Sequence, residues 1–432
     1  MTNFERGFVE LARYALIDDE SCPALPDGFS YEVAYTLAET QQLTPLMYYG
    51  ACKTPDFLMS SAMMTYFTRT CEYISISEMQ MSEYARIAAR FEEAGIDYAP
   101  VKGVVTKSLY PQPDMRLMGD CDILIRKEQY DKINAVMEEL GYTGEPGEGH
   151  EFTYNHPNGV EIELHHQLVP TFEKDLYTYF GDGWKFQKPV EGYAHRYEMS
   201  PEDAFIFSFG HFVKHYRLHG AGMKYVLDFR QYMVHYPDLD MDYIREGLGK
   251  LNLGEFLDNV LRVLDVWFND APSDERTDFL TTKLITESTF GMEENGSLSE
   301  ALREEENKRV KSGGDTDTRI NAGRARRRRW LHNIFLPYSD MCLKYPVLEK
   351  WAILLPLFWV VRIFDVLFFH RDRLKENAQK MDNTLTQEQL EQYKKDLALV
   401  GLTYNYEEFE SEWQQMVKEK EKEKQTTGAG QA

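Results

Sequence analysis

The sequence predicts an α+β protein, in which a small mixed sheet is embedded in mostly helical flanking regions. Two observations lead to this class. Residues 1–90 and 200–289 carry apolar side chains at the three- and four-residue spacing of amphipathic helices. Between them, short alternating apolar runs are separated by Gly, Pro and Asn, as in strands joined by turns. The 432 residues suffice for two or three compact units.

The unit over residues 91–190 is expected to contain the sheet. Its predicted elements, in order, are a strand at 96–101, a helix at 104–110, a strand at about 120–126, a helix at 127–140 and a hairpin of strands at 152–154 and 160–168. The hairpin turn at 156–159 contains Asn158-Gly159, a pair that tolerates positive φ.

The flanking regions are predicted from periodicity and composition. They are an N-terminal helical region at 1–90, a helical domain at 200–289, a polar mobile linker at 290–323, a basic and apolar helical region at 324–380, and a C-terminal helix with a disordered tail at 381–432. The helical domain opens with Ser200-Pro201, where Ser suits the cap and Pro the first helical position.

Composition favours a reduced cytoplasmic protein. The formal net charge of −23 argues against broad binding to duplex nucleic acid, which requires many Lys and Arg contacts to phosphate. The five cysteines are scattered, with no CxxC pair, and the first residues lack a signal-peptide pattern. The longest apolar stretch, 351–369, is interrupted by Pro356, Arg362 and Asp365, so no integral membrane span is expected.

A basic run is the exception to this acidic composition. Residues 324–329 contain five arginines in six positions and precede an aromatic-rich apolar block. A solvated helix face is the first interpretation of such a run. Weak contact with an anionic membrane surface or with RNA, through Arg324–Arg329, is the alternative.

The chemistry of the chain is concentrated on two predicted strands. Asp120 and Asp122 are two residues apart at the start of an apolar strand, so their carboxylates share one face. Like charges held this close repel unless a cation lies between them. On the later strand Glu161, Glu163 and His165 also share a face. Strand parity alone does not choose between Glu161 and Glu163 as a third acid.

Cationic and glycine residues upstream suit a phosphate group. Gly103 follows Lys102 at a strand-to-helix junction, where backbone N–H groups favour anions and the missing Cβ allows close approach. Lys102 and Arg116 are the expected cationic partners of a phosphate chain, although Arg116 could instead hold its loop by a salt bridge.

One family shares these motifs. They are Val101-Lys102-Gly103 with Leu109-Tyr110, the run from Arg116 to Ile125, Ile162-Glu163-Leu164-His165, and His211-Phe212-Val213-Lys214-His215 with Tyr225-Val226-Leu227-Asp228. In these motifs, residues 35–370 resemble the uncharacterised bacterial nucleotidyltransferase family of the DNA polymerase β-like superfamily. The resemblance implies a polymerase β-like core at 91–190. It also implies Mg²⁺-dependent transfer of a nucleoside monophosphate from an NTP to an acceptor hydroxyl or phosphate.

The resemblance also assigns roles to residues. It implies Asp120, Asp122 and Glu163 as catalytic residues and metal ligands. Two Mg²⁺ ions, or Mn²⁺ in their place, fit such a carboxylate set. Substrate contacts are expected from Lys102, Gly103, Arg116, Lys214 and His215. His211 and His215 could also be interpreted as a zinc pair at helical spacing, but no Glu lies between them as in zinc proteases.

Three other functions remain open from the sequence. One is an antitoxin-like or toxin-like transferase that modifies tRNA or protein. A non-catalytic nucleotide-binding or scaffold protein could retain the same fold. A glycosyltransferase with a D-x-D motif would use a nucleotide sugar and Mn²⁺, but it needs a larger nucleotide domain before the acids, where this chain is helical. The acceptor, the NTP and the oligomeric state are not specified by the sequence.

Overall fold

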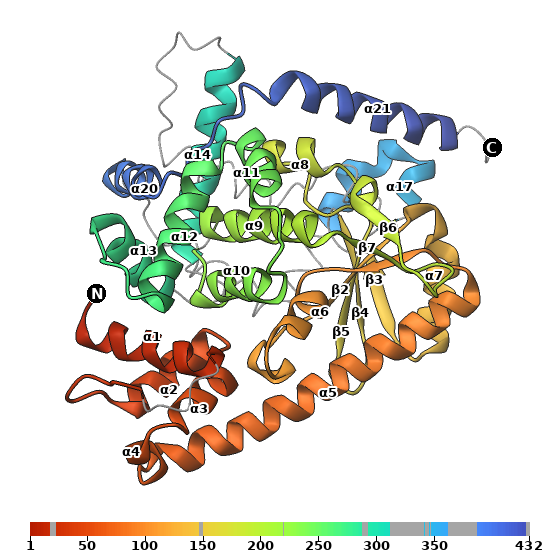
Figure 1. Cartoon of the computed structure of the whole chain (residues 1–432). Coiled ribbons are helices and arrows are strands. Elements are labelled where there is room, and N and C mark those ends of the chain that lie inside the picture. Colours follow the sequence, from red (N-terminus) through yellow and green to blue (C-terminus); the bar gives the residue numbers. More distant parts are fainter. Residues whose placement is uncertain are drawn as a thin grey trace.

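The structure is a computed structural model that describes residues 1–17, 23–146, 150–218, 220–286, 293–311, 341, 345, 347–361 and 387–428. Within these residues, helices surround one small mixed sheet (Figure 1), so the predicted α+β class is confirmed. The arginine run at 324–329 lies outside the described residues. Among the helices described, none combines the length and apolar character needed to cross a membrane.

The central sheet has five strands in the order β1-β2-β5-β4-β3. Their bounds are β1 Tyr98–Pro100, β2 Cys121–Ile125, β3 Thr143–Pro146, β4 Glu151–Asn155 and β5 Glu161–His165. Only β2 and β5 are parallel neighbours, and the other pairs are antiparallel. The turn between β4 and β5 has Gly159 at φ +90°, as its Asn-Gly pair predicts.

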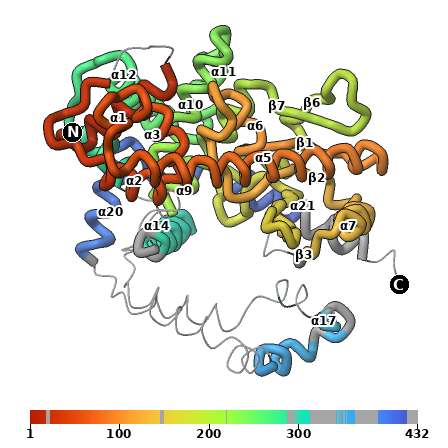
Figure 2. The backbone as a smooth tube through the Cα atoms, turned by 90° about the horizontal axis from the view of Figure 1, so that it is seen from below, coloured from red at the N-terminus to blue at the C-terminus, as the bar shows by residue number. Residues whose placement is uncertain are grey.

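One face of the sheet is covered by two helices, α5 (Ala62–Ala94) and α7 (Tyr130–Glu139). Both views show α5 running from the N-terminal helices to the sheet (Figures 1 and 2). The apolar residues of β2 that point to this side, Cys121, Ile123 and Ile125, are fully buried against these helices. α5 ends at Gly95, whose φ of +66° is the left-handed cap that glycine favours.

The opposite face of the sheet meets the larger helical part of the molecule. Leu124 of β2 belongs to a second apolar core, which joins the N-terminal helices to the later helices. The N-terminal and the later helices thus share one core. The domain boundaries proposed from the sequence stay a prediction. The remaining helices are α1 Asn3–Leu16, α2 Tyr31–Thr40, α3 Thr44–Ala51, α4 Pro55–Leu58, α6 Gly103–Thr106, α8 Lys174–Phe180, α9 Pro201–Leu218, α10 Met223–His235, α11 Met241–Lys250, α12 Gly254–Phe268, α13 Glu275–Thr286, α14 Glu293–Lys311, α17 Val347–Lys350, α20 Gln387–Leu399 and α21 Glu410–Gly428.

Several elements differ from those predicted. Residues 293–311, expected within a mobile linker, form α14, because Leu298, Ala301 and Leu302 pack into the main core. The edge strand β3 and the small ribbon of β6 (Gln187–Pro189) and β7 (Tyr197–Met199) were not predicted. α21 continues to Gly428 and is held to the body where Lys174 pairs with Glu410. Residues 429–432 lie outside the described part.

Candidate active site

The pairing of β2 with β5 brings the predicted acids together. Asp122 is the register partner of Glu163, and since Cys121 pairs with Ile162, Asp120 lies beside Glu161. Neighbouring residues in register point to the same face of a sheet. Carboxylate oxygens of Asp120, Glu161 and Glu163 lie within 4.8 Å of one another. The structure therefore gathers Asp120, Asp122 and Glu163, with Glu161 still beside them.

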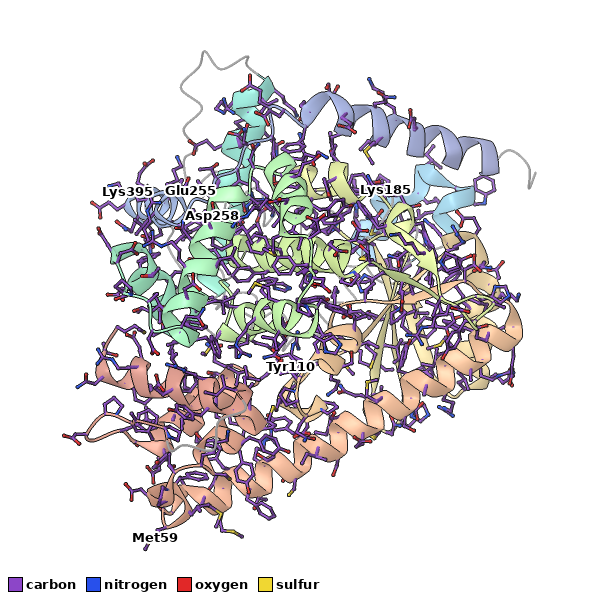
Figure 3. The ribbon with its side chains drawn as sticks, viewed as in Figure 1. Met59, Tyr110, Lys185, Glu255, Asp258 and Lys395 are labelled. Carbon is purple, nitrogen blue, oxygen red and sulfur yellow. The ribbon has the colours of Figure 1, made fainter. Side chains whose placement is uncertain are left out.

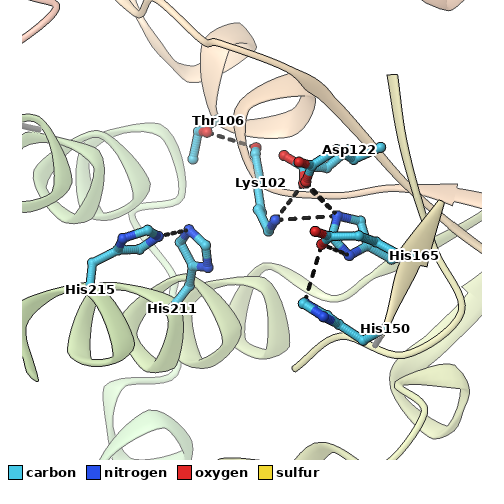
Figure 4. A network of polar contacts seen from close by, with 9 residues as sticks. Lys102, Thr106, Asp122, His150, His165, His211 and His215 are labelled. Atoms are coloured by element: carbon cyan, nitrogen blue, oxygen red, sulfur yellow. Dashed lines mark hydrogen bonds and ion pairs between the residues drawn. The ribbon is translucent and has the colours of Figure 1, made fainter. Parts of the chain in front are cut away.

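Asp122 is the most buried acid of the group, and it is held by two partners. The Lys102 ammonium donates to its Oδ1, and His165 Nε2 lies 2.7 Å from the same oxygen. Burial disfavours the carboxylate, but Lys102 and His165 outweigh this effect and hold the pKa of Asp122 well below its usual range. Asp122 is therefore ionised at neutral pH. Figure 4 shows its contacts with Lys102 and His165.

The pKa of Asp120 is shifted in the opposite direction to that of Asp122. Burial, followed by the neighbouring Asp122 carboxylate, raises the pKa of Asp120 to about 7. Lys102 lowers this pKa only in part. Two acids two residues apart thus have pKa values pushed in opposite directions, which is typical of functional sites.

Lys102 has an unusual backbone conformation. Its φ of +51° lies in the left-handed region, which residues other than glycine rarely adopt. Its carbonyl accepts hydrogen bonds from the N–H groups of Val105 and Thr106 and from the Thr106 hydroxyl. From this backbone position the Lys102 side chain reaches Asp122. Non-glycine residues with positive φ are concentrated at functional sites.

Gly103 begins the four-residue helix α6. A Cβ at this position would lie 2.9 Å from Met118 Cβ, so glycine is required for close packing against the loop before β2. This contact explains the glycine in the described structure. A role of its amide in phosphate binding stays a prediction.

Arg116 lies apart from the acids, in a second buried cluster. Its Nε and Nη2 donate to the two carboxylate oxygens of Asp228 on α10, at 2.8 and 2.9 Å. The hydroxyl of Tyr110, a residue labelled in Figure 3, also donates to Asp228, at 2.7 Å. Asp228 is thus paired with Arg116 rather than with the cations of α9. This is the loop-holding salt bridge weighed from the sequence, and a substrate contact of Arg116 stays a prediction.

α9 faces the acids from across the site. His211 Nε2 lies 3.0 Å from His215 Nε2, and Figure 4 shows this pair beside Lys102. Burial first, and then His215 and Lys102, hold the pKa of His211 well below its usual value. Burial and then Lys102 also lower the pKa of Lys214. Lys214 and His215 therefore lie around the acids, and their contact with substrate stays a prediction.

Two residues of the site were not predicted from the sequence. His150 and Glu151 lie at the start of β4, and Glu151 is the register partner of His165. Burial first, and then His165, lower the pKa of His150 to about 2. His165 itself is disfavoured as a cation by burial, but hydrogen bonds to Asp122 and Glu163 raise its pKa overall. The sequence did contain a signal for Glu151. Glu151 and Thr153 are two residues apart on β4, so both side chains point to the face of the sheet that carries Glu163.

The donor set suits a hard divalent cation. Carboxylate oxygens are the ligands that Mg²⁺ prefers, and one or two carboxylates with substrate phosphates usually hold it. Here burial, and then the Asp122 and Glu163 carboxylates, raise the pKa of Asp120, and Lys102 offsets these effects only in part. The residues present therefore fit a metal site.

Comparison with known proteins agrees with this geometry. Residues 27–269, more than half of the chain, match the family described as uncharacterised nucleotidyltransferase. The chain belongs to this nucleotidyltransferase family. The matched range includes the sheet, all the acids of the site and helices α9 to α12.

Other comparisons add little to this family assignment. No curated protein matches the chain. Among solved structures, an antigenic nucleotidyltransferase-like protein from Paracoccidioides brasiliensis is similar, with 17% identity over 43% of this chain and 93% of that chain. Its TM-score of 0.28 is too low to support an argument. Membership in the nucleotidyltransferase family thus rests on the family match, and it assigns nucleotidyl transfer as the general activity.

Proposed function

We propose that this nucleotidyltransferase is Mg²⁺-dependent and moves a nucleoside monophosphate from an NTP to an acceptor hydroxyl or phosphate. The observation that carries the proposal is the pairing of Asp122 with Glu163 across the parallel strands, with Asp120 beside them. The family match supports transfer in general. The metal, the NTP and the acceptor are parts of the proposal.

Asp120, Asp122 and Glu163 would hold Mg²⁺, with room in the donor set for two ions and with Mn²⁺ as a substitute. When bound, the cation supplies charge neutralisation for the phosphates and favours the ionised acceptor. The other contributions come from side chains. Glu163 takes the proton from the acceptor hydroxyl. The acceptor oxygen bonds to the α-phosphorus, the bond from that phosphorus to the bridging oxygen breaks, and pyrophosphate leaves.

The cationic residues provide binding and orientation. Lys102 pairs with Asp122 before substrate binds. When another group neutralises the charge of Asp122, the Lys102 ammonium turns to the phosphates. On α9, Lys214 interacts electrostatically with Lys102 and Asp122, and His215 lies on the same helix (Figure 4); both are proposed to border the nucleotide. Gly103 and Arg116 complete the predicted set. Of these, Arg116 reaches the nucleotide only if its pair with Asp228 opens.

The structure is less suited to the glycosyltransferase alternative. Such an enzyme needs a large doubly wound parallel sheet, whereas only one strand pair of this sheet is parallel. A non-catalytic nucleotide-binding protein differs from our proposal only in turnover. The experiment below separates these two functions. A cytoplasmic setting is also part of the proposal, supported by the free thiols of Cys52, Cys71 and Cys121 in the described part.

Label transfer tests the proposal. The purified chain is incubated with Mg²⁺, a cell extract and each NTP labelled at the α- or the γ-phosphate. We expect acceptors labelled from the α-phosphate only, and no labelling by the Asp120→Asn/Asp122→Asn double variant. Equal labelling by the double variant, or label from the γ-phosphate, would refute nucleotidyl transfer at this site. Nucleotide binding without any labelling would favour the scaffold function.

A further inference from the structure

Next to the carboxylate site lies a cluster of different chemistry, formed by His150, Glu151 and His165. One ligand atom from each residue lies within 4.8 Å of the other two. The Glu151 Oε2 atom is 3.3 Å from His150 Nε2 and 3.5 Å from His165 Nδ1. Two imidazoles thus converge on one carboxylate oxygen, with the ring centres of the histidines 5.5 Å apart.

The hydrogen bond to Asp122 fixes the orientation of His165. An ionised carboxylate only accepts hydrogen bonds, so the 2.7 Å contact with Asp122 requires a proton on Nε2. The other nitrogen, Nδ1, then points to Glu151. A metal-binding histidine commonly donates its second N–H to a carboxylate in this way.

Nδ1 of His165 lacks a satisfying partner. The residue is only 1% exposed, and Nδ1 makes no hydrogen bond to any of the residues that the structure describes. Buried polar nitrogens are usually satisfied, so an orphan atom of this kind calls for an explanation. A cation bound between Nδ1, Glu151 and His150 would provide the missing partner.

From this geometry we infer that His150, Glu151 and His165 form a second cation site, which takes a transition-metal dication of the zinc class rather than Mg²⁺. Two imidazole nitrogens and one carboxylate oxygen are characteristic zinc ligands, whereas Mg²⁺ prefers oxygen alone. Tetrahedral Zn²⁺ with bonds of about 2.0–2.2 Å places its ligand atoms roughly 3.3–3.6 Å apart. The two measured separations, 3.3 and 3.5 Å, fall in that range.

Three protein ligands leave one coordination position for water or a substrate atom, as in zinc sites that act on substrates. His165 links the two sites, because its Nε2 contacts Asp122 while its Nδ1 faces the proposed zinc. This inference does not depend on the proposed nucleotidyl transfer, since Zn²⁺ binding is measured without substrate.

Competition with a chromogenic chelator tests the site. The full chain is stripped with EDTA and titrated with Zn²⁺, and Co²⁺ is added separately to record its visible absorption. We expect one tight equivalent of Zn²⁺, not displaced by excess Mg²⁺, and the intense bands of tetrahedral Co²⁺. His150→Ala and Glu151→Gln should each weaken Zn²⁺ binding by about tenfold or more.

Two histidine variants serve as matched controls. His235→Asn removes an exposed imidazole on α10, and His211→Ala removes one member of the pair on α9. Both should bind Zn²⁺ as the wild type does. The inference is overturned if the wild type binds no stoichiometric Zn²⁺, if His150→Ala and Glu151→Gln bind it unchanged, or if His211→Ala alone abolishes binding. Circular dichroism of each stripped variant ensures that only folded chains are compared.

Discussion

Asp122 of β2 and Glu163 of β5 are direct neighbours in register across the one parallel strand pair of the described sheet. Both carboxylates therefore emerge on the face toward α9, while Ile123 and Leu164 are buried on the other face against α5 and α7. Residues 41 positions apart in the sequence form one site because a strand pairing joins them.

The ion pair between Lys102 and Asp122 should limit metal binding. Asp122 is nearly inaccessible, so Lys102→Met leaves it with His165 alone and should lower the metal-free stability by roughly 3 kcal/mol. Mg²⁺ should then raise the melting temperature more in the variant than in the wild type, because Lys102 no longer competes for the carboxylate. Differential scanning calorimetry with and without Mg²⁺ measures both effects.

Lys185→Met is the control for this comparison, since Lys185 is exposed and lies against Tyr179 and Phe186, away from the acids. Its melting temperature should respond to Mg²⁺ as the wild type does. An identical Mg²⁺ response in Lys102→Met would contradict the competition.

Metal affinity should depend on pH through Asp120. Its pKa is raised to about 7 by burial and by Asp122, so below that pH it carries a proton that Mg²⁺ must displace. The apparent Mg²⁺ affinity should therefore increase with pH, by about tenfold per unit well below pH 7, and level off above about pH 8. Calorimetry in buffers of different ionisation enthalpy should detect proton release at pH 6 but not at pH 8. In Asp120→Asn this pH dependence should disappear, and its persistence there would assign the proton to another group.

The acids illustrate what the sequence could predict. The i, i+2 spacing of Asp120 and Asp122 and the alternation of Glu161, Glu163 and His165 follow from strand geometry, which is local. The pairing of the two strands depends on tertiary packing. From the sequence it was a hypothesis that would bring a third acid beside Asp120 and Asp122, and the family resemblance favoured Glu163 for that acid. The contact of Lys102 with Asp122 likewise required the fold, because its positive φ is imposed by the junction before α6.

The missed elements have physical reasons of the same kind. β3 contains Gly144 and Pro146, residues typical of loops, and it forms only as the edge partner of β4. α14 is strongly polar, yet Leu298 and Leu302 bury one side of it in the main core. In both cases tertiary contacts override the local signal.

The pair of Arg116 and Asp228 should be a major contribution to stability. Both side chains are buried, and the guanidinium contacts both carboxylate oxygens. Removing one partner leaves the other charge buried, so Arg116→Met or Asp228→Asn should each cost about 3–5 kcal/mol of unfolding free energy. The double variant should cost much less than the sum of the two. Urea denaturation measures all three.

Arg126→Met provides the matched control. Arg126 pairs with Asp97 at 2.7 Å, but its side chain is 38% exposed. Loss of this ion pair should therefore lower the free energy of unfolding by only about 0–1 kcal/mol. If Arg116→Met is as mild as this control while nucleotide affinity falls sharply, Arg116 acts on substrate and the structural interpretation is wrong.

The buried Lys107 should give stability its own pH dependence. Its ammonium donates to the Ser77 hydroxyl and the Arg116 carbonyl, and burial, with Arg116 nearby, lowers its pKa to about 8. The unfolded chain therefore binds more protons than the folded one between about pH 8 and 10.5, and this group stabilises the fold increasingly as pH rises through that window. The free energy of unfolding of Lys107→Met, taken relative to that of the wild type, should be roughly 3 kcal/mol higher at pH 7 than at pH 10.5. Urea unfolding curves at the two pH values give this difference, and an unchanged difference between variant and wild type at the two pH values would contradict the lowered pKa of Lys107.

The most direct test of the central claim is a calorimetric titration of the full chain with a non-hydrolysable NTP analogue, with and without Mg²⁺. If Asp120, Asp122 and Glu163 hold the metal that binds the phosphates, the wild type binds the analogue only when Mg²⁺ is present. The Asp120→Asn/Asp122→Asn variant, folded by circular dichroism, then loses this binding. Equal affinity without Mg²⁺, or Mg²⁺-dependent binding retained in the double variant, would contradict the account.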